Sequence, residues 1–299
     1  GETLVCDAAF KKIGNIAHQS EWKESTFDGY NKVSVPLEWT PHLKEECEKC
    51  NIEYFTSPYS INFIDQLEKY VSAWKIGSGD ITFHDSIEKM SKSKKPILLA
   101  TGASTEDEVK EAVNLILKNN NNLILMQCNT NYSGSHENFK YINLNVLKTY
   151  EKLFPDVILG LSDHTPGHAT VLGSVAMGAR VVEKHFTDNN DLQGPDHKFS
   201  LSPKNWKIMV EKTRELELSL GNYSKKIEDN EKETVVIQRR GIRANRLIKK
   251  GQVIKDDYLS FLRPCNKDCL PPSKKKMVVG KKTKTDIKKD DPINFQNIE

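Results

Sequence analysis

Polar residues follow a series of short apolar segments in this chain, and two of these segments lead into histidines. Residues 157–161 lead to His164, and the next apolar segment, residues 179–182, leads to His185. In a parallel α/β barrel the carboxyl ends of the strands converge on one face, so these two imidazoles become neighbours. Imidazole is a common ligand of divalent transition metals. The pattern therefore predicts an active-site rim where His164 and His185 share one metal ion.

Other strand ends carry side chains suited to anion binding and proton transfer. The polar tips lie at residues 75–80, 100–102, 127–130, 162–165 and 183–185. Side chains alternate along a strand, so Glu183 and His185 share one face while Lys184 takes the other. Taken alone, Glu183 and Lys184 could form a surface ion pair, Lys75 could be a solvated lysine, and His164 could be a loop histidine. Their occurrence together at successive strand ends favours a common site.

The elements that position these tips alternate between strands and helices. One apolar segment leads into Lys75, and five more are typical of strands buried on both faces: 52–56, 96–101, 123–126, 157–161 and 179–182. In the clearest helix Thr105 and Glu108 form a capping box, and apolar residues recur at helical spacing. These residues are Val109, Ala112, Val113, Ile116 and Leu117. We predict an α/β fold, a TIM-type (β/α)8 barrel that lacks its first two strands.

The two missing strands are expected from the beginning of the chain. Six strands are found where a closed barrel needs eight, and the residues before position 52 contain no comparable apolar run. The chain starts without methionine, a signal-peptide core or a segment long enough to cross a membrane. We expect a cytoplasmic protein whose N-terminal part has been lost. A natural open sheet of six strands is the alternative.

A second domain of opposite charge is expected after the barrel. Residues 1–221 form the predicted barrel, the charged segment 222–234 is a predicted linker, and residues 235–299 form the small domain. Residues 239–299 hold 17 Lys/Arg against 7 Asp/Glu, whereas residues 1–238 hold 27 against 34. The segment 247–254 recurs 39 residues later at 286–293, which indicates a pseudo-symmetric module of short strands and turns.

Composition also argues against two other classes of site. The positive charges of the small domain are scattered between turns with few aromatic residues, so we expect no nucleic-acid partner. A solvated lysine-rich surface, or docking against an acidic barrel mouth, explains the charge asymmetry with fewer assumptions. Cys47 and Cys50 have no second cysteine pair at zinc-site spacing, so we expect no structural zinc.

Seven motifs resemble those of the sialic acid synthases, in order and across both domains. They are KIGSG at 75–79, LATGAS at 99–104, CNT at 128–130, GLSDHT at 160–165, EKHFT at 183–187, GPDH at 194–197 and RR at 239–240. The resemblance implies an N-acetylneuraminate synthase-like barrel. Such a barrel condenses phosphoenolpyruvate with an N-acetylated amino sugar, such as N-acetylmannosamine, to a nine-carbon 2-keto acid and phosphate. It also implies a C-terminal SAF domain, similar to type III antifreeze proteins.

The resemblance implies a role for individual residues. Lys75 and Ser78 would hold the phosphate and carboxylate of phosphoenolpyruvate, with Asn129, Ser162 and Thr101 completing the grip. His164 and His185 would bind a divalent metal, Mn²⁺ with Mg²⁺ or Co²⁺ as alternatives. Glu183 and Asp196 would contact the sugar and its reacting carbonyl, and Tyr132 would contact the sugar. Arg240 would reach the sugar site of the partner subunit in a domain-swapped homodimer.

Some positions depart from the family pattern. The residues implied for the first two barrel strands would precede Gly1, and Gly241 stands where a serine is common. Cys265 and Cys269 flank a turn where a glycine-containing loop is usual, and the sequence assigns them no role. Three functions stay open: a sialic acid-type synthase, a legionaminic acid-type synthase with a different acceptor sugar, and a truncated binding protein without catalysis. Neither the sequence nor the resemblance identifies the acceptor sugar.

Overall fold

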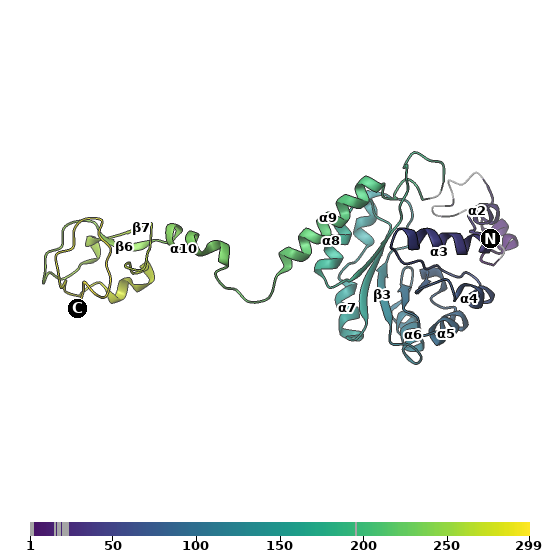
Figure 1. Ribbon diagram of the computed structural model, residues 1–299, viewed down its shortest axis with the longest axis horizontal. Coiled ribbons are helices and arrows are strands. Elements are labelled where there is room, and N and C mark those ends of the chain that lie inside the picture. Colours follow the sequence, from purple (N-terminus) through teal and green to yellow (C-terminus); the bar gives the residue numbers. More distant parts are fainter. Residues whose placement is uncertain (1–2, 15, 17–18, 20–23, 195) are drawn as a thin grey trace. The chain divides into compact units, whose positions relative to one another are not determined.

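The protein is described by a computed structural model that covers residues 3–14, 16, 19, 24–194 and 196–299. The chain divides into two compact units, Gly1–Gly221 and Asn222–Glu299. The first unit is built around a parallel sheet with helices packed along it (Figure 1). The second unit contains one short antiparallel pair of strands.

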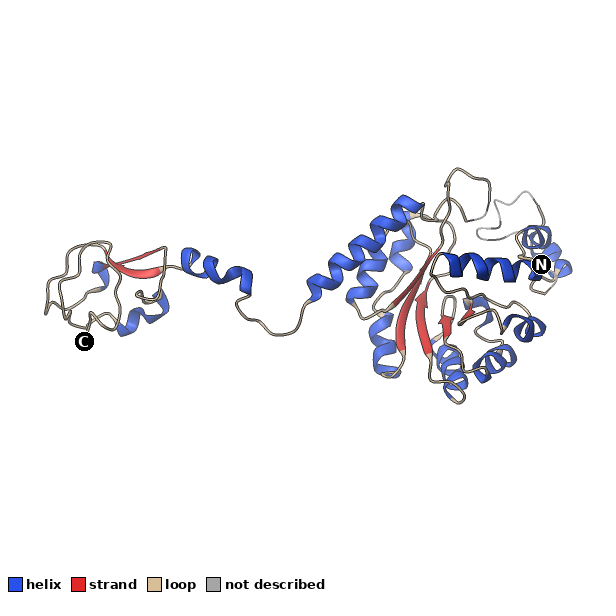
Figure 2. Ribbon diagram, viewed as in Figure 1, coloured by secondary structure: helices blue, strands red, loops and turns tan. Residues whose placement is uncertain are grey.

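The sheet of the first unit has five parallel strands in the order in which they occur along the chain. They are β1 (Trp74–Ile76), β2 (Ile97–Ala100), β3 (Leu123–Cys128), β4 (Ile158–Asp163) and β5 (Val181–Lys184). Each strand pairs with the next in parallel register. The strands curl into a half-barrel with helices on the outside (Figure 2). The prediction of a TIM-like α/β fold is therefore confirmed.

Helices connect the strands and precede them. Those of the first unit are α1 (Asp7–Ile13), α2 (Thr26–Lys32), α3 (Thr40–Lys49), α4 (Ile61–Leu67), α5 (His84–Lys92), α6 (Glu106–Leu117), α7 (Val146–Leu153), α8 (Ala169–Ala176) and α9 (Pro203–Leu220). Short 3-10 helices are η2 (Leu37–Trp39), η3 (Ser78–Asp80) and η4 (His136–Tyr141). The predicted capping box of α6 is present. The Thr105 side chain accepts a hydrogen bond from Glu108 N, and the Glu108 side chain accepts one from Thr105 N. Among the described residues, no helix has the length and apolarity needed to span a bilayer.

The two faces of the sheet have different occupants. Trp74 and Ile76 belong to the large core beneath the helices, together with apolar residues of β2, β3 and α6. The residue between them, Lys75, pairs in register with Leu98, which belongs to a separate small cluster with Met126. Successive side chains of a strand point to opposite faces. The alternation therefore directs Lys75 to the concave face of the half-barrel.

The prediction of a first strand over residues 52–56 is wrong. Only Thr56 forms a β-bridge, to Trp74, and Thr56 O accepts a hydrogen bond from Lys75 N at 3.2 Å. Upstream of this bridge, Ser72 N donates to Tyr54 O at 3.1 Å. The segment therefore runs beside β1 without forming a regular ladder. Tyr54 packs against the core, whereas Ile52 and Phe55 are exposed.

The second unit is a small module with its own core. Its strands are β6 (Gly241–Ala244) and β7 (Leu259–Leu262), and its 3-10 helices are η5 (Asp229–Glu231), η6 (Asp256–Tyr258) and η7 (Pro272–Met277). The sequence repeat has a structural counterpart, because Ile248 and Ile287 bridge each other and are both buried. The equivalent turn positions, Gly251 and Asp290, both have positive φ, at 77° and 71°. Two related half-modules thus pair across a local pseudo-symmetry.

Two details of this region concern the predicted linker and the departures from the family pattern. The predicted linker, residues 222–234, contains η5 and the start of α10 (Lys232–Gln238). At Gly241, a Cβ atom would lie 2.0 Å from Cys269 Sγ, which itself contacts the Ile242 carbonyl at 3.4 Å. The buried Cys269 thus occupies the space that a side chain at position 241 would need. Glycine at 241 and cysteine at 269, both departures from the family pattern, therefore pack against each other.

Candidate active site

A cavity of about 340 Å³ lies at the carboxyl ends of the strands in the first unit. Eight of the predicted site residues line it: Lys75, Ser78, Tyr132, Ser162, His164, Glu183, His185 and Asp196. They come from the ends of three strands, β1, β4 and β5, and from the loops after β3 and β5, which are far apart in sequence. The parallel sheet brings them together as a barrel face does.

A row of polar side chains crosses three neighbouring strands at the floor of this cavity. Cys128 on β3 pairs in register with Ser162 on β4, and Ser162 pairs with Glu183 on β5. All three line the cavity, and Ser162 Oγ donates to Glu183 Oε1 at 3.2 Å. The register of the ladder thus fixes which residues share the concave face. Glu183 and His185 both line the cavity and Lys184 does not, as their alternation predicted.

Hydrogen-bond donors gather at one end of the cavity. Lys75 is buried, and its Nζ lies 3.5 Å from Glu183 Oε2 and 3.3 Å from the Ile76 carbonyl. Ser78 Oγ accepts a hydrogen bond from Gly102 N at 2.8 Å, which fixes this hydroxyl against the loop after β2. An ammonium group and a positioned hydroxyl are the partners that a phosphate or carboxylate requires. This end of the cavity is therefore suited to a small anion.

The two histidines lie together in the same cavity, with ring centroids 5.1 Å apart. His164 Nδ1 lies 2.8 Å from the Asn129 carbonyl oxygen. Because a carbonyl only accepts, Nδ1 carries the proton and Nε2 keeps its lone pair. Burial lowers the pKa of His164 to about 4, although the bond to Asn129 opposes this. The imidazole is neutral at pH 7, which is the form that binds metal.

Asp196 enters the cavity from the loop after β5. Its Oδ2 lies 3.3 Å from His185 Nδ1. The loop is tied back to its own base, since Ser200 Oγ donates to the Asp196 carbonyl at 2.6 Å and Thr187 Oγ1 lies 2.7 Å from His197 Nδ1. The carboxylate is therefore held next to the second histidine. An acidic group at this position can orient the imidazole or take part in proton transfer.

His164 and His185 are the imidazole donors in the lining of the cavity. A ligating histidine typically donates its other ring nitrogen to a carbonyl or carboxylate, and His164 does so to Asn129. Within the part of the chain that the structure describes, no group of three or more His, Cys, Asp or Glu residues could hold a metal. His164 and His185 are therefore the pair of nitrogen ligands that these residues could offer a cation, and its remaining positions would fall to water and substrate oxygens.

Three predicted residues lie outside the cavity lining. Thr101 Oγ1 donates to the Met126 carbonyl at 3.0 Å and accepts from Tyr150 Oη at 2.9 Å, so its hydroxyl links β2 to α7. The Asn129 amide donates to the Tyr141 carbonyl at 3.3 Å, and its contribution to the site is the backbone carbonyl. Arg240 belongs to the second unit, where its guanidinium donates to the Phe261 carbonyl at 2.7 Å.

Sequence reasoning missed several residues around the cavity. The segment before β1 contributes Tyr30, Val33, Ser57 and Tyr59 to the lining, and β3 contributes Cys128. Tyr59 Oη would lie 3.3 Å from a Cβ atom at Gly77, so the glycine allows this ring to approach the loop after β1. Burial raises the pKa of Tyr59 and of Cys128, which keeps both protonated at neutral pH. No spacing signal marks these residues, because their placement depends on long-range packing.

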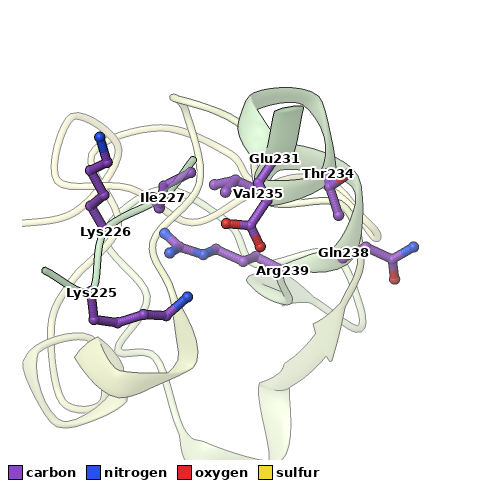
Figure 3. A pocket seen from close by; sticks show the side chains of 8 residues that line it. All are labelled: Lys225, Lys226, Ile227, Glu231, Thr234, Val235, Gln238 and Arg239. Atoms are coloured by element: carbon purple, nitrogen blue, oxygen red, sulfur yellow. The ribbon is translucent and has the colours of Figure 1, made fainter. Parts of the chain in front are cut away.

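A second hollow, of about 460 Å³, lies in the second unit around α10 (Figure 3). Lys225, Lys226 and Arg239 line it together with Glu231, while Ile227 and Val235 supply apolar surface. The lining contains no histidine or cysteine, and the charges are of both signs. It therefore lacks the ligands and the convergent donors that distinguish the cavity of the first unit.

Known proteins resemble both units. The chain matches the NeuB family over residues 2–225 and the SAF domain over residues 239–299. It is 36% identical to an uncharacterised protein of Methanocaldococcus jannaschii, covering 100% of this chain and 89% of the relative. It is 33% identical to N,N'-diacetyllegionaminic acid synthase of Campylobacter jejuni, covering 81% of this chain and 73% of that enzyme.

Solved structures agree with this relationship. N-acetylneuraminic acid (sialic acid) synthetase from Leptospira borgpetersenii in complex with citrate is 26% identical, with a TM-score of 0.65 over 77% of this chain and 82% of that chain. The family match spans most of the first unit, including every cavity residue described above. The chain therefore belongs to the NeuB family of sialic acid-type synthases and ends in a SAF domain.

Proposed function

We propose that this protein condenses phosphoenolpyruvate with an N-acetylated amino sugar, releasing phosphate and a sialic acid-type 2-keto acid. The observation that carries the proposal is the cavity in which a buried lysine, two serines, two carboxylates and two histidines converge. One end is suited to a phosphorylated anion, and the other is suited to a polarised carbonyl. A synthase that joins these two substrates needs both ends within one cavity.

The reaction forms one carbon–carbon bond and releases one phosphate. The enol carbon of phosphoenolpyruvate attacks the aldehyde carbon of the open-chain sugar, and the aldehyde oxygen takes a proton to become a hydroxyl. Water adds to the adjacent cationic carbon, which then expels phosphate as the ketone forms. Glu183 and Asp196 are the groups placed to exchange these protons. Lys75 and Ser78 hold the anion in place throughout.

A divalent cation completes this proposal. His164 and His185 would hold Mn²⁺, with Mg²⁺ or Co²⁺ as alternatives, and the bound ion supplies a Lewis acid for the aldehyde oxygen. His164 is already oriented by the Asn129 carbonyl, and His185 lies beside Asp196. Ser162 and Glu183 lie between the histidines and Lys75, where the two substrates would meet.

Two further parts of the proposal concern assembly and setting. Arg240, in the second unit, would reach the sugar site of a partner subunit in a domain-swapped homodimer. The cytoplasm is the setting we propose, with no nucleic-acid partner. The acceptor is an N-acetylmannosamine-type sugar or the more heavily modified precursor of a legionaminic-type acid, since relatives of both kinds exist.

The test is a phosphate-release assay with phosphoenolpyruvate, Mn²⁺ and each acceptor in turn. We expect turnover with one acceptor class, and loss of turnover in His164→Ala, in His185→Ala and after exhaustive chelation. Activity that survives chelation or either substitution would remove the metal from the proposal. Phosphoenolpyruvate binding without turnover for any acceptor would favour the non-catalytic binding protein instead.

A further inference from the structure

A buried ion pair lies directly behind the site residues, on the opposite face of the same two strands. Lys184 Nζ and Asp163 Oδ2 are 2.7 Å apart, and their side chains are 1% and 0% exposed. Neither residue lines the cavity. Removing two charges from water costs several kcal/mol per ion, so such a pair persists only with good geometry and further hydrogen bonds.

The surroundings supply those hydrogen bonds. Asp163 Oδ1 accepts from Thr165 N at 3.0 Å and from Thr165 Oγ1 at 2.9 Å. Its Oδ2 accepts from Thr170 Oγ1, in α8, at 2.5 Å. Lys184 Nζ also donates to the Thr165 carbonyl at 2.6 Å. The network therefore joins β4, the loop after it, α8 and β5 into one polar cluster.

This network is interleaved with the residues of the candidate site. Asp163 lies between Ser162 and His164, and Lys184 lies between Glu183 and His185. Asp163 and Lys184 are partners in the β4–β5 ladder, one step beyond the pair formed by Ser162 and Glu183. Each side chain of the ion pair is thus covalently flanked by two cavity residues. Any shift of one strand tip relative to the other therefore moves one histidine relative to the other.

We propose that the Asp163–Lys184 pair is a positioning device that sets the mutual geometry of His164 and His185. The inference rests on the proposed function for its purpose, although the geometry itself is independent of any substrate. The hydrogen bonds of the β4–β5 ladder end at Asp163 and Lys184, so the ladder alone does not fix the backbone conformation of the segment after β4. The capture of the Thr165 carbonyl and amide by the pair fixes that path at the residue following His164. His164 Nδ1 then meets the Asn129 carbonyl.

The test uses the full chain with ¹⁵N-labelled histidine, free of metal, at pH 8. In the wild type, NMR should report one His164 tautomer, with the proton on Nδ1. The double variant Asp163→Asn/Lys184→Met removes both charges together, so that neither charge is left buried without its partner. We expect its His164 signal to show averaging of the two tautomers. Thr170→Val, which removes one hydrogen bond to Asp163, should give a smaller change in the same direction.

Mn²⁺ affinity, measured on the metal alone by electron paramagnetic resonance, is the second readout. Changes to groups that orient metal ligands typically cost about 10- to 100-fold in affinity, and we expect that loss in the double variant. If the wild type binds no Mn²⁺, the proposed metal centre fails, but the tautomer measurement still decides the positioning proposal. The two proposals are thereby distinguished.

Two control variants separate positioning from general destabilisation. Asp65→Asn/Lys89→Met removes an ion pair of the same types and the same 2.7 Å separation on an exposed surface. Val113→Ala removes a fully buried core side chain of α6, which lowers stability without touching the strand tips. Both controls should keep the wild-type tautomer. A double variant that retains it together with wild-type Mn²⁺ affinity, or a Val113→Ala variant that loses it equally, would overturn the proposal.

Discussion

Lys75 is the residue on which the anion end of the cavity depends. It is a buried lysine whose nearest carboxylate oxygen, on Glu183, is 3.5 Å away. This separation is at the limit for a hydrogen bond, so the pair is held by charge rather than by a tight bond. A doubly charged phosphate that enters the cavity offers a stronger partner. The Lys75 ammonium is therefore suited to leave the Glu183 carboxylate and pair with the phosphate of a bound substrate.

We predict that Lys75→Ala weakens phosphoenolpyruvate binding by about 1.5–3 kcal/mol, the range for hydrogen bonds to charged groups. Sugar binding should change much less, because the lysine lies at the anion end. Titration calorimetry of each ligand measures both effects. Lys89→Ala, which removes a half-buried lysine paired with Asp65, is the matched control. Unchanged phosphoenolpyruvate affinity in Lys75→Ala would contradict the anion grip.

Cys128 allows a prediction about reactivity. Its thiol is buried in the cavity floor, and burial raises its pKa, so the thiolate fraction at pH 8 is small. Cys6 and Cys50 are exposed. Iodoacetamide at pH 8 should therefore alkylate Cys6 and Cys50 well before Cys128, with peptide mass spectrometry as the measurement. Urea-unfolded protein, in which all three thiols should react alike, is the control. Rapid native labelling of Cys128 would show that the cavity floor is open.

The residue scale also shows what sequence reasoning can reach. Strand alternation places Glu183 and His185 on one face and Lys184 on the other, and the structure agrees. The same reasoning does not identify Asp163 as the partner of Lys184, because Asp163 lies 21 positions away on another strand. Thr101 was assigned to the anion site, yet its hydroxyl is taken by Tyr150, 49 positions away. Pairings of this kind depend on register and helix placement, which periodicity does not encode.

At the scale of elements, the loop after β2 is the tightest part of the site. A Cβ atom at Gly102 would lie 2.5 Å from Thr130 Cγ2, 3.0 Å from Ser78 Oγ and 3.1 Å from Cys128 Sγ. The loops after β1, β2 and β3 therefore meet at this glycine. Its lack of a side chain allows Gly102 N to reach Ser78.

We predict that Gly102→Ala lowers the free energy of unfolding by about 1–3 kcal/mol, the usual cost of overpacking. It should also weaken phosphoenolpyruvate binding, because Ser78 must move. Chemical denaturation and calorimetry measure the two effects. Gly79→Ala is the control for stability, since nothing lies within 4 Å of a Cβ atom at Gly79. Equal stability of the two variants would mean that the three loops can separate without cost.

Element prediction succeeded where the local signals were strong. The capping box and the apolar spacing of α6 predicted its start and its buried face, and both are observed. The five strands from β1 to β5 were predicted close to their observed positions. The segment 52–56 was composed like a strand but forms only the Thr56 bridge. Strand formation requires a partner with matching register, and composition alone does not supply one.

At the scale of the whole molecule, the chain before position 239 and the chain after it differ in charge. Residues 1–238 carry a net charge of −7, and residues 239–299 carry +10. Charges of opposite sign accelerate and orient association between surfaces. The dimer that we propose would use this attraction to bring Arg240 of one subunit towards the sugar site of the other. This arrangement predicts an active site composed of residues from two chains.

Mixed dimers test that arrangement directly. Lys75→Ala removes the anion grip from a site, and Arg240→Ala removes the proposed contribution from the partner. If Arg240 acts across the interface, a heterodimer of the two variants contains one site with both substitutions and one with neither. Purified heterodimers should then show about half the activity of the wild type, measured by phosphate release. If Arg240 instead serves its own chain, every site carries one substitution and mixing gives no recovery.

Two conditions make this result decisive. Each variant must be folded, which circular dichroism can establish, and Arg240→Ala is suited to this because its side chain is exposed and donates to a single carbonyl, that of Phe261. Heterodimers must also form, which two different affinity tags can verify. The salt dependence adds an independent check, since attraction between exposed charges weakens above about 0.15 M ionic strength. Verified heterodimers without recovery would exclude the swapped arrangement while leaving the cavity of the first unit intact as the site of chemistry.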